Sequence, residues 1–273
     1  YLIYDDGTVA DGFPFEAGSK FRSSPSILNV NGELIIIAGN NDNHVYGINS
    51  DGSLRFSVET EHDVETSPSF LNYLNDCYIF FGDNDGYIYA IDYNGNMYPN
   101  FPIDVGSQLS KSIVFSDLDS DGLVEVISAN ESGEIYVFKT NGEFLQNFPI
   151  TYEFPISSAL TIFDVDNDND LEIFAGTTNS LLMLDIKSTG SLDNNWNIHG
   201  GDNKRSSFYN IVCVLMDIYP DGIINIVDIV AGVNIILGSL EPSASQSCSA
   251  DVNQDSIINV NDIVSIVNTI LDE

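Results

Sequence analysis

A unit of about 45 residues recurs along the first two thirds of the chain. Each copy contains a short apolar strand, a turn that ends in glycine and a second strand, as in HVYGINSDGSLRFSV and YIYAIDYNGNMYPNFPI. The turn glycines are Gly7, Gly52, Gly95, Gly142 and Gly190, which are 45, 43, 47 and 48 residues apart. Further strands bounded by Gly, Asn and Asp lie between these turns, so each unit holds about four short strands.

This spacing and strand count are typical of the blades of a β-propeller. The alternative, an up-and-down β-sandwich, would not repeat its turn motifs at such regular intervals. We therefore predict all-β propeller blades of four strands, with about four visible repeats, over residues 1–195. Residues 196–212 are predicted to be a closing segment or linker in which Trp196 packs against the last blade. Residues 213–273 form a second, smaller domain.

The first repeat begins partway through a unit. Its segment YLIYDDG aligns with HVYGINSDG and YIYAIDYNG, which are late strands of their blades. We expect this to be a processed or excerpted product, in which the missing blades come from an upstream part of the same precursor or from a partner chain. The alternative is a four-bladed ring that is closed by pairing of Tyr1–Tyr4 with strands near Leu181–Leu184.

The chain is strongly acidic, with eight Lys and Arg against 41 Asp and Glu and a formal charge of −33. Such a surface repels phosphate backbones and anionic lipid heads, so we expect neither nucleic acid nor membranes as partners. No apolar run approaches the ~18–20 residues that cross a bilayer. Because 43% of the residues are hydrophobic, disorder does not explain the charge. Carboxylates clustered around cations, or adaptation to a salty medium, remain as explanations.

Two repeats carry a ladder of carboxylates, D-x-D-x-D-x-x-x-E. The ladders contain Asp117, Asp119, Asp121 and Glu125, and then Asp164, Asp166, Asp168 and Glu172, displaced by 47 residues. Alternating carboxylates on a tight loop converge on one point and offer the hard oxygen ligands that Ca²⁺ prefers. Gly122 and Asn169 hold the sixth position, where a left-handed turn is accepted. We predict a structural calcium ion in each loop.

At these residues the chain resembles the FG-GAP/VCBS repeats of integrin-α-like propellers, over about residues 20–195. The resemblance implies a structural calcium ion in a hairpin loop, with the backbone carbonyls of Leu123 and Asp170 completing the two ligand sets. The equivalent stretches of the first two blades, LNVNGEL and LNYLNDCY, lack the carboxylate ladder. We expect no metal there.

A new repeat of 34 residues begins after Asn210, in a region that contains no Lys or Arg. DIYPDGIINIVDIVAGVNIIL and DVNQDSIINVNDIVSIVNTIL each start with a twelve-residue loop. The oxygen-bearing positions of the two loops are Asp217, Asp221, Asn225 and Asp228, then Asp251, Asn253, Asp255, Asn259 and Asp262. A helix is predicted after each loop, because Val230, Val233 and Leu237, and then Val264, Val267 and Leu271, lie at helical spacing.

Two such loop–helix units resemble a type I dockerin, a small all-α module of paired calcium loops. The resemblance implies two structural calcium ions, carbonyl ligands at Ile223 and Ile257, and docking to a cohesin module of another protein. Tyr219 replaces a ligand of the first loop, so that site should be weaker, and the whole chain should hold about three to four ions. In cellulosomal dockerins, positions 10 and 11 of each loop contribute to partner recognition and are a Ser-Thr pair. Here these positions are Ile226 and Val227 in the first loop, and Val260 and Asn261 in the second. A cohesin and the protein's own propeller therefore both stay open as the partner.

The cysteines point to an oxidising compartment. Cys213 and Cys248 bracket one repeat of the C-terminal module, which suits a disulfide, whereas Cys77 is expected to be a buried thiol. We therefore expect a secreted or cell-surface protein.

We find no catalytic motif in the sequence. His44, His62 and His199 lie in separate segments without metal-ligand or triad spacing and are interpreted as exposed loop residues. Lys204 and Arg205 form a small basic island. The favoured function is a non-catalytic, secreted, calcium-binding scaffold that docks into an extracellular assembly, through a cohesin-like module, upstream blades or another subunit. The alternative is the non-catalytic C-terminal portion of a larger secreted hydrolase, lyase or peptidase.

Overall fold

The computed structural model describes residues 1–30, 32–73, 76–109, 111–192, 196–202, 204–211, 214–219, 223–240, 242, 244–253, 255 and 257–271. The chain divides into two compact units. The first comprises Tyr1–Leu28, Leu34–Leu71 and Tyr78–Tyr209, and the second comprises Asn29–Glu33, Asn72–Cys77 and Asn210–Glu273.

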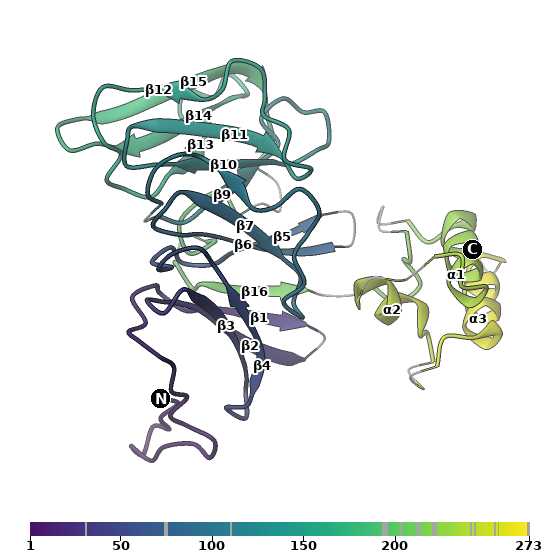
Figure 1. The fold of residues 1–273 in the computed structure, drawn as a ribbon. Helices are drawn as coiled ribbons and strands as arrows, with labels where there is room; N and C mark the ends of the chain where they lie inside the picture. The colour runs from purple at the N-terminus through teal and green to yellow at the C-terminus, as the bar shows by residue number, and fades with distance from the viewer. Residues whose placement is uncertain are drawn as a thin grey trace. The chain divides into compact units, whose positions relative to one another are not determined.

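Four antiparallel sheets follow one another in chain order through the first unit (Figure 1). The first contains β1 (Ser26–Val30), β2 (Glu33–Asn40), β3 (His44–Asn49) and β4 (Leu54–Glu59), with β16 (Phe208–Ile211) beside β1. The second contains β5 (Ser69–Tyr73), β6 (Asp76–Gly82), β7 (Tyr87–Ile91) and β8 (Ile103–Asp104). The third contains β9 (Val114–Ser116), β10 (Glu125–Ala129), β11 (Glu134–Lys139) and β12 (Ile150–Thr151). The fourth contains β13 (Thr161–Phe163), β14 (Asp170–Gly176) and β15 (Leu181–Thr189). Small meandering sheets of this kind confirm the prediction of propeller-like blades.

The sheets pack on one another through their apolar faces. Val114, Ile127 and Val137 of the third sheet share one buried cluster with Ile162 and Ile173 of the fourth. The middle strands β10 and β11 are buried along most of their length, as expected for strands that are covered on both faces. Burial between neighbouring sheets, rather than within one sheet, therefore stabilises this unit.

The segment that begins at Trp196 touches the first strand of every sheet. The backbone oxygen of Trp196 accepts the N–H of Phe115 in β9 at 3.0 Å, and that of Asn197 accepts the N–H of Ile162 in β13 at 3.0 Å. The ring of Trp196 lies 5.4 Å from that of Phe70 in β5, and β16 pairs with β1. Residues up to Tyr209 belong to the first compact unit, so most of the predicted closing segment, 196–212, is part of the blades' own core.

The N-terminal residues form a hairpin of their own. Ile3 pairs with Val9, the N–H of Tyr4 donates to the carbonyl of Thr8, and Tyr1 is 81% exposed. The alternative in which Tyr1–Tyr4 pair with Leu181–Leu184 is therefore wrong, because the N-terminus pairs within its own hairpin and lies at the opposite end of the series of sheets from β15 (Figure 1). The origin of further blades stays a prediction.

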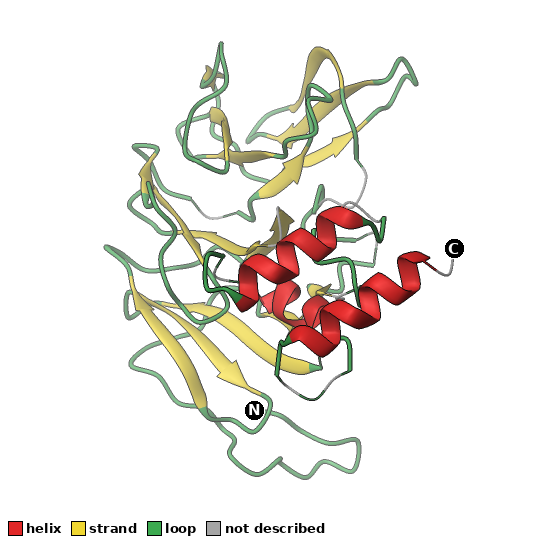
Figure 2. Ribbon diagram, turned by 90° about the vertical axis from the view of Figure 1, so that its right-hand side faces the viewer, coloured by secondary structure: helices red, strands yellow, loops and turns green. Residues whose placement is uncertain are grey.

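The second unit contains α1 (Ile226–Ile236), α2 (Ala244–Ala250) and α3 (Val260–Leu271) (Figure 2). A helix thus follows each predicted loop. Ile218, Ala231, Ala250, Ile263 and Ile266 form its buried core. Helices α1 and α3 approach closely at Gly232, where a Cβ would lie 2.4 Å from the Cδ1 of Ile263. Among the described residues, no helix has the length and apolar character to cross a membrane.

The predicted disulfide stays a prediction, because Cys213 lies outside the described residues. Cys77 is buried, as the sequence led us to expect. We expect thiol counting on the denatured, unreduced protein to find one reactive group, and three after reduction. A bridge of this kind closes a loop of ~35 residues and is worth roughly 3–4 kcal/mol. Three reactive thiols before reduction would contradict the pairing.

We expect Trp196→Ala to lower the free energy of unfolding by about 3–5 kcal/mol, because it leaves a cavity among the first strands. Chemical denaturation followed by far-UV circular dichroism measures this. Phe163→Ala is the matched control, since Phe163 is 55% exposed and its removal should cost less than about 1 kcal/mol. Equal effects of the two variants would show that the closing segment does not stabilise the blades.

Candidate metal centres

The first acidic loop joins β9 to β10 and is shaped by its own carboxylates. An oxygen of Glu125 accepts the N–H of Leu118 at 2.8 Å, and Asp117 accepts the N–H of Gly122 at 3.1 Å. Gly122 has a φ of +82°, in the left-handed region that the sequence predicted for the sixth position. These bonds turn the chain tightly, so that alternating side chains converge.

The second acidic loop, between β13 and β14, repeats this geometry. Glu172 accepts the N–H of Val165 at 2.8 Å, and Asp164 accepts the N–H of Asn169 at 3.2 Å. Asn169 has a φ of +72°, which asparagine tolerates better than most residues. The two loops are therefore equivalent in backbone hydrogen bonding as well as in sequence.

One short segment holds the two loops together. The N–H of Gly190 donates to the carbonyl of Asn169 in the second loop at 2.9 Å. The N–H of the next residue, Ser191, donates to the carbonyl of Asp117 in the first loop at 2.7 Å. The loops of neighbouring blades are thus joined by consecutive backbone groups.

Each loop gathers carboxylate oxygens within 4.8 Å of one another, a separation that suits shared binding of one metal ion. The first group consists of Asp117, Asp119 and Glu125, and the second of Asp166, Asp168, Asp170 and Glu172. Buried oxygens of Asp117, Glu125 and Asp170 accept no hydrogen bond from the part of the chain that the structure describes. Since a buried carboxylate oxygen without a donor is costly, these atoms fit direct bonds to a cation.

The electrostatics of the first loop agree with this. Burial raises the pKa of the Glu125 carboxyl to about 7, and the charges of Asp119, Asp121 and Asp117 raise it as well. In the second loop the pKa of Asp166 is raised by desolvation and by the neighbouring Asp168. A divalent cation reverses these effects, because it favours the ionised form of every carboxylate around it.

Three residues of these loops, Asp121, Asp164 and Asp170, have contacts that the sequence pattern did not predict, and the predicted metal ligands themselves stay predictions. Asp121 lies 3.3 Å from Lys139 and accepts the N–H of Leu123, and these contacts lower its pKa. Asp164 accepts two backbone N–H groups and lies outside its carboxylate group. Asp170, for which only the backbone carbonyl was predicted, brings its carboxylate into the group. The predicted carbonyl contacts of Leu123 and Asp170 stay predictions.

In the C-terminal module, the last carboxylate of each loop holds the loop backbone. Buried Asp228 accepts the N–H groups of Tyr219 and Asn225, both at 2.8 Å. Buried Asp262 accepts those of Asn253 at 3.2 Å and Asn259 at 2.9 Å.

The predicted metal ligands of this module stay predictions. Asp221 lies outside the described residues. No metal-sized group of three carboxylates occurs in the described portions of these loops. All its other predicted ligands therefore stay predictions: Asp217, Ile223, Asn225, Asp228, Asp251, Asn253, Asp255, Ile257, Asn259 and Asp262.

The histidines do not all match the interpretation as exposed loop residues. His44 begins β3 and is partly buried beside Asp42. His199 is partly buried, and its Nδ1 lies 2.6 Å from the Oγ of Ser112. Ser112 and His199 are 87 positions apart in the sequence, so no local pattern could have predicted that they meet.

A family model described as an FG-GAP-like repeat matches residues 117–175, a range that contains both acidic loops. A search of curated proteins found no match. Among solved structures, the computationally designed Ika4 protein is similar at 18% identity and a TM-score of 0.46, over 63% of this chain and 94% of that one. BBS1N from its complex with ARL6DN is similar at 10% identity and 0.48, over 68% and 56%. BamB from Moraxella catarrhalis is similar at 16% identity and 0.45, over 67% and 51%.

Chelation tests the two blade loops. We expect calcium at a hundred times its dissociation constant to stabilise the blades by about 2.7 kcal/mol per site over the chelated protein. Fluorescence of Trp196, the single tryptophan, follows unfolding of this unit. Glu125→Gln/Glu172→Gln should lose most of the response, whereas Glu143→Gln, an exposed acid outside the loops, should keep it. Equal melting midpoints of the unmodified protein with calcium and with EGTA would contradict the metal sites.

Proposed function

We propose that this protein is a non-catalytic, calcium-stabilised interaction scaffold that acts outside the cell and docks through its C-terminal module to a cohesin-type module of another protein. The FG-GAP-like repeat and the small stacked sheets support a scaffold role for the blades. The carboxylate groups of the two acidic loops support calcium as the structural ion. The resemblance to a type I dockerin supports the docking role.

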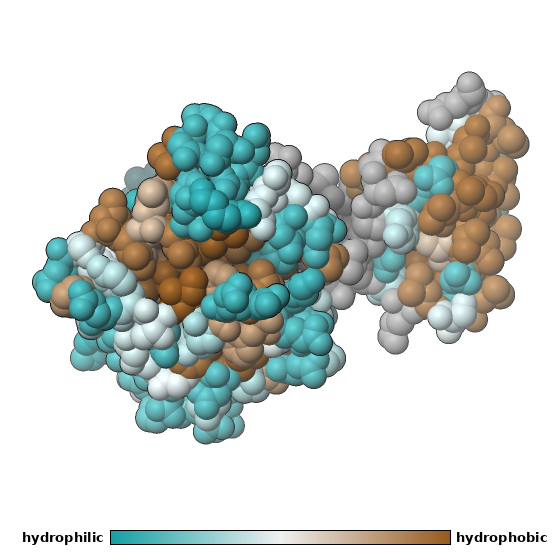
Figure 3. Space-filling view, turned by 90° about the horizontal axis from the view of Figure 1, so that it is seen from above, coloured by the Kyte–Doolittle hydropathy of each residue, from teal (hydrophilic) through white to brown (hydrophobic). Residues whose placement is uncertain are grey.

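A duplicated apolar stripe carries the docking part of the proposal. Ile226 and Val230 of α1 and its C-cap residue Leu237 are exposed. So are Val260, Val264 and Leu271 of α3, each 34 residues later. Val230 is 54% and Val264 50% exposed. Figure 3 shows apolar side chains gathered over one face of the helical module. An exposed apolar surface that is repeated in register is typical of a protein interaction site.

The charge of the C-terminal module indicates which kind of partner protein it could bind. The module contains no Lys or Arg after Asn210, so acidic and neutral groups surround the stripe. A complementary partner therefore presents an apolar centre with a neutral or basic rim, because like charges across an interface oppose binding. The acidic blades of this chain fit that description poorly, which favours a separate protein over folding back.

The buried carboxylates of the module connect calcium to docking. Asp228 caps the first turn of α1 together with Asn225, and Asp262 occupies the same position in α3. Ions bound in these loops would fix the helix starts and hence the spacing of the stripe.

Titration calorimetry of the full chain against a panel of purified cohesin modules tests the proposal. We expect at least one calcium-dependent complex. Val230→Glu/Val264→Glu should weaken it by about 100-fold or more, as for the central residues of an interface. Leu54→Glu, an equally exposed apolar position on β4, is the matched control and should bind as the unmodified chain does.

Sedimentation of the same samples shows whether a cohesin or a second copy of this chain covers the apolar stripe. A monomer that binds a cohesin supports the proposal. A stable dimer of the chain alone, or a monomer that binds none of the panel in calcium, would overturn the docking assignment and leave the blade loops unaffected.

A further inference from the structure

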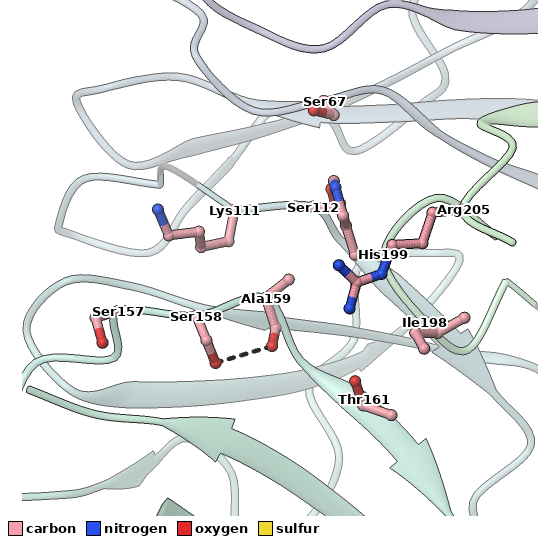
Figure 4. A pocket seen from close by; sticks show the side chains of 10 residues that line it. All are labelled: Ser67, Lys111, Ser112, Ser157, Ser158, Ala159, Thr161, Ile198, His199 and Arg205. Carbon is pink, nitrogen blue, oxygen red and sulfur yellow. Dashed lines mark hydrogen bonds between the residues drawn. The ribbon is translucent and has the colours of Figure 1, made fainter. Parts of the chain in front are cut away.

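A polar cavity of about 400 Å³ lies within the first compact unit. Its walls include Lys111, Ser112, Ser158, Thr161, His199 and Arg205 (Figure 4). A volume of this size is in the range of small-molecule binding sites. Among the described residues that line it there is no Asp, Glu, Phe, Tyr or Trp, although the chain has 41 acidic residues and 29 Phe and Tyr.

The cavity contains an unusual share of the positive charge. Only eight Lys and Arg occur in the chain, and two of them line this one space. Lys139, Lys187 and Arg22 lie within 4.0 Å of carboxylates. In the described part of the chain, neither Lys111 nor Arg205 has such a carboxylate neighbour. Their charge is therefore available to a ligand.

The positive charges of Lys111 and Arg205 also affect the protonation of His199. Burial lowers the pKa of this imidazole, and the charges of Arg205 and Lys111 lower it further. A neutral His199 leaves its ring able to exchange a hydrogen bond with Ser112, whose Oγ is 2.6 Å away.

Segments far apart in sequence form the walls. Lys111 and Ser158 each lie three residues before the first strand of their sheets, and Ser67 lies two residues before β5. The hydroxyl groups of Ser67 and Ser158 thus lie, like Lys111, just before the first strands of successive blades. The N–H of Ser24, in the first blade, donates to the Oγ of Ser67. The opposite wall is the loop that follows Trp196.

This loop is built to hold Arg205 in place. The N–H of Arg205 donates to the carbonyl of Asp202 at 2.8 Å, and the side chain of Asp202 accepts the N–H groups of Lys204 and Ser206. Arg205 has a φ of +53°, a backbone region that is uncommon for residues other than glycine. Backbone strain of this kind is found at ligand-binding positions.

From this geometry we propose that the cavity binds a small hydroxylated carboxylate of the sugar-acid class. Arg205 would hold the carboxylate, Lys111 would donate to the ligand from another part of the lining, and the seryl and threonyl hydroxyls would exchange hydrogen bonds with the ligand's hydroxyl groups. The described lining contains no Phe, Tyr or Trp and only the small ring of His199, so it offers little stacking surface to nucleobases and aromatic acids. The charge of −33 disfavours long polyanions, which must approach across the acidic exterior.

Calorimetry of the full chain at low ionic strength tests this, with calcium held constant and D-glucuronate and D-galacturonate as probes. We expect binding of at least one uronate, no binding of D-glucose, and weakening by added salt. Lys111→Gln and Arg205→Gln should each weaken binding about tenfold or more, which is the loss of one charge-assisted contact. Arg205→Lys should retain part of it.

Lys204→Gln is the matched control, because Lys204 adjoins Arg205 in the chain but does not line the cavity. It should bind as the unmodified chain does. Unchanged Trp196 melting curves verify that the variants are folded. Equal binding of glucose and glucuronate, tighter binding of glucose 6-phosphate, equal loss in all glutamine variants, or no uronate binding by the folded protein would overturn the assignment. None of these outcomes bears on cohesin docking.

Discussion

Two buried glutamates hold the acidic loops of the third and fourth blades against their hairpins. Glu125 and Glu172 each accept the backbone N–H of the residue seven positions earlier, so the loop shape depends on a carboxylate that has left water. At Glu125 burial raises the pKa of the carboxyl, and the neighbouring carboxylates add to the effect. Gly190 and Ser191 then join the two loops by consecutive backbone bonds. A cation bound in one loop would therefore also stabilise the other loop, because Gly190 and Ser191 bond to both of them.

The closing segment, which begins at Trp196, connects the first strands of the sheets in a similar way. Trp196 and Asn197 accept N–H groups from the third and fourth sheets, and β16 extends the first. Because one segment serves all the blades, its loop places His199 and Arg205 opposite the residues that precede the strands. The basic cavity is thus a consequence of how the blades are closed and of no single motif. A ligand there would contact several blades at once and stabilise their arrangement.

Local patterns predicted the parts of this protein that are local. The glycine turns gave the repeat, the carboxylate ladders gave the loops, and helical spacing gave α1 and α3. The failures involve partners that are distant in sequence. Lys139 lies 18 residues from Asp121 and 3.3 Å from its carboxylate, a contact that the ladder pattern does not predict. His199 meets Ser112 only because the closing segment returns to the blades, so its position in the chain said nothing of its burial.

The distribution of charge explains why one chain can combine these surfaces. Of the buried carboxylates that the structure describes, those of Asp117, Glu125, Asp170 and Glu172 lie in metal-sized groups, and Lys139 and Lys187 lie within 4.0 Å of carboxylates. Repulsion from the exterior acts over a Debye length of about 8 Å at physiological salt, so it opposes extended polyanions more than a single small anion. Inside the cavity the charged residues of the described lining are Lys111 and Arg205, which are both positive. The acidic exterior and the basic cavity therefore select together for a small anion, whereas the same exterior favours a macromolecular partner with a basic rim at the helical module.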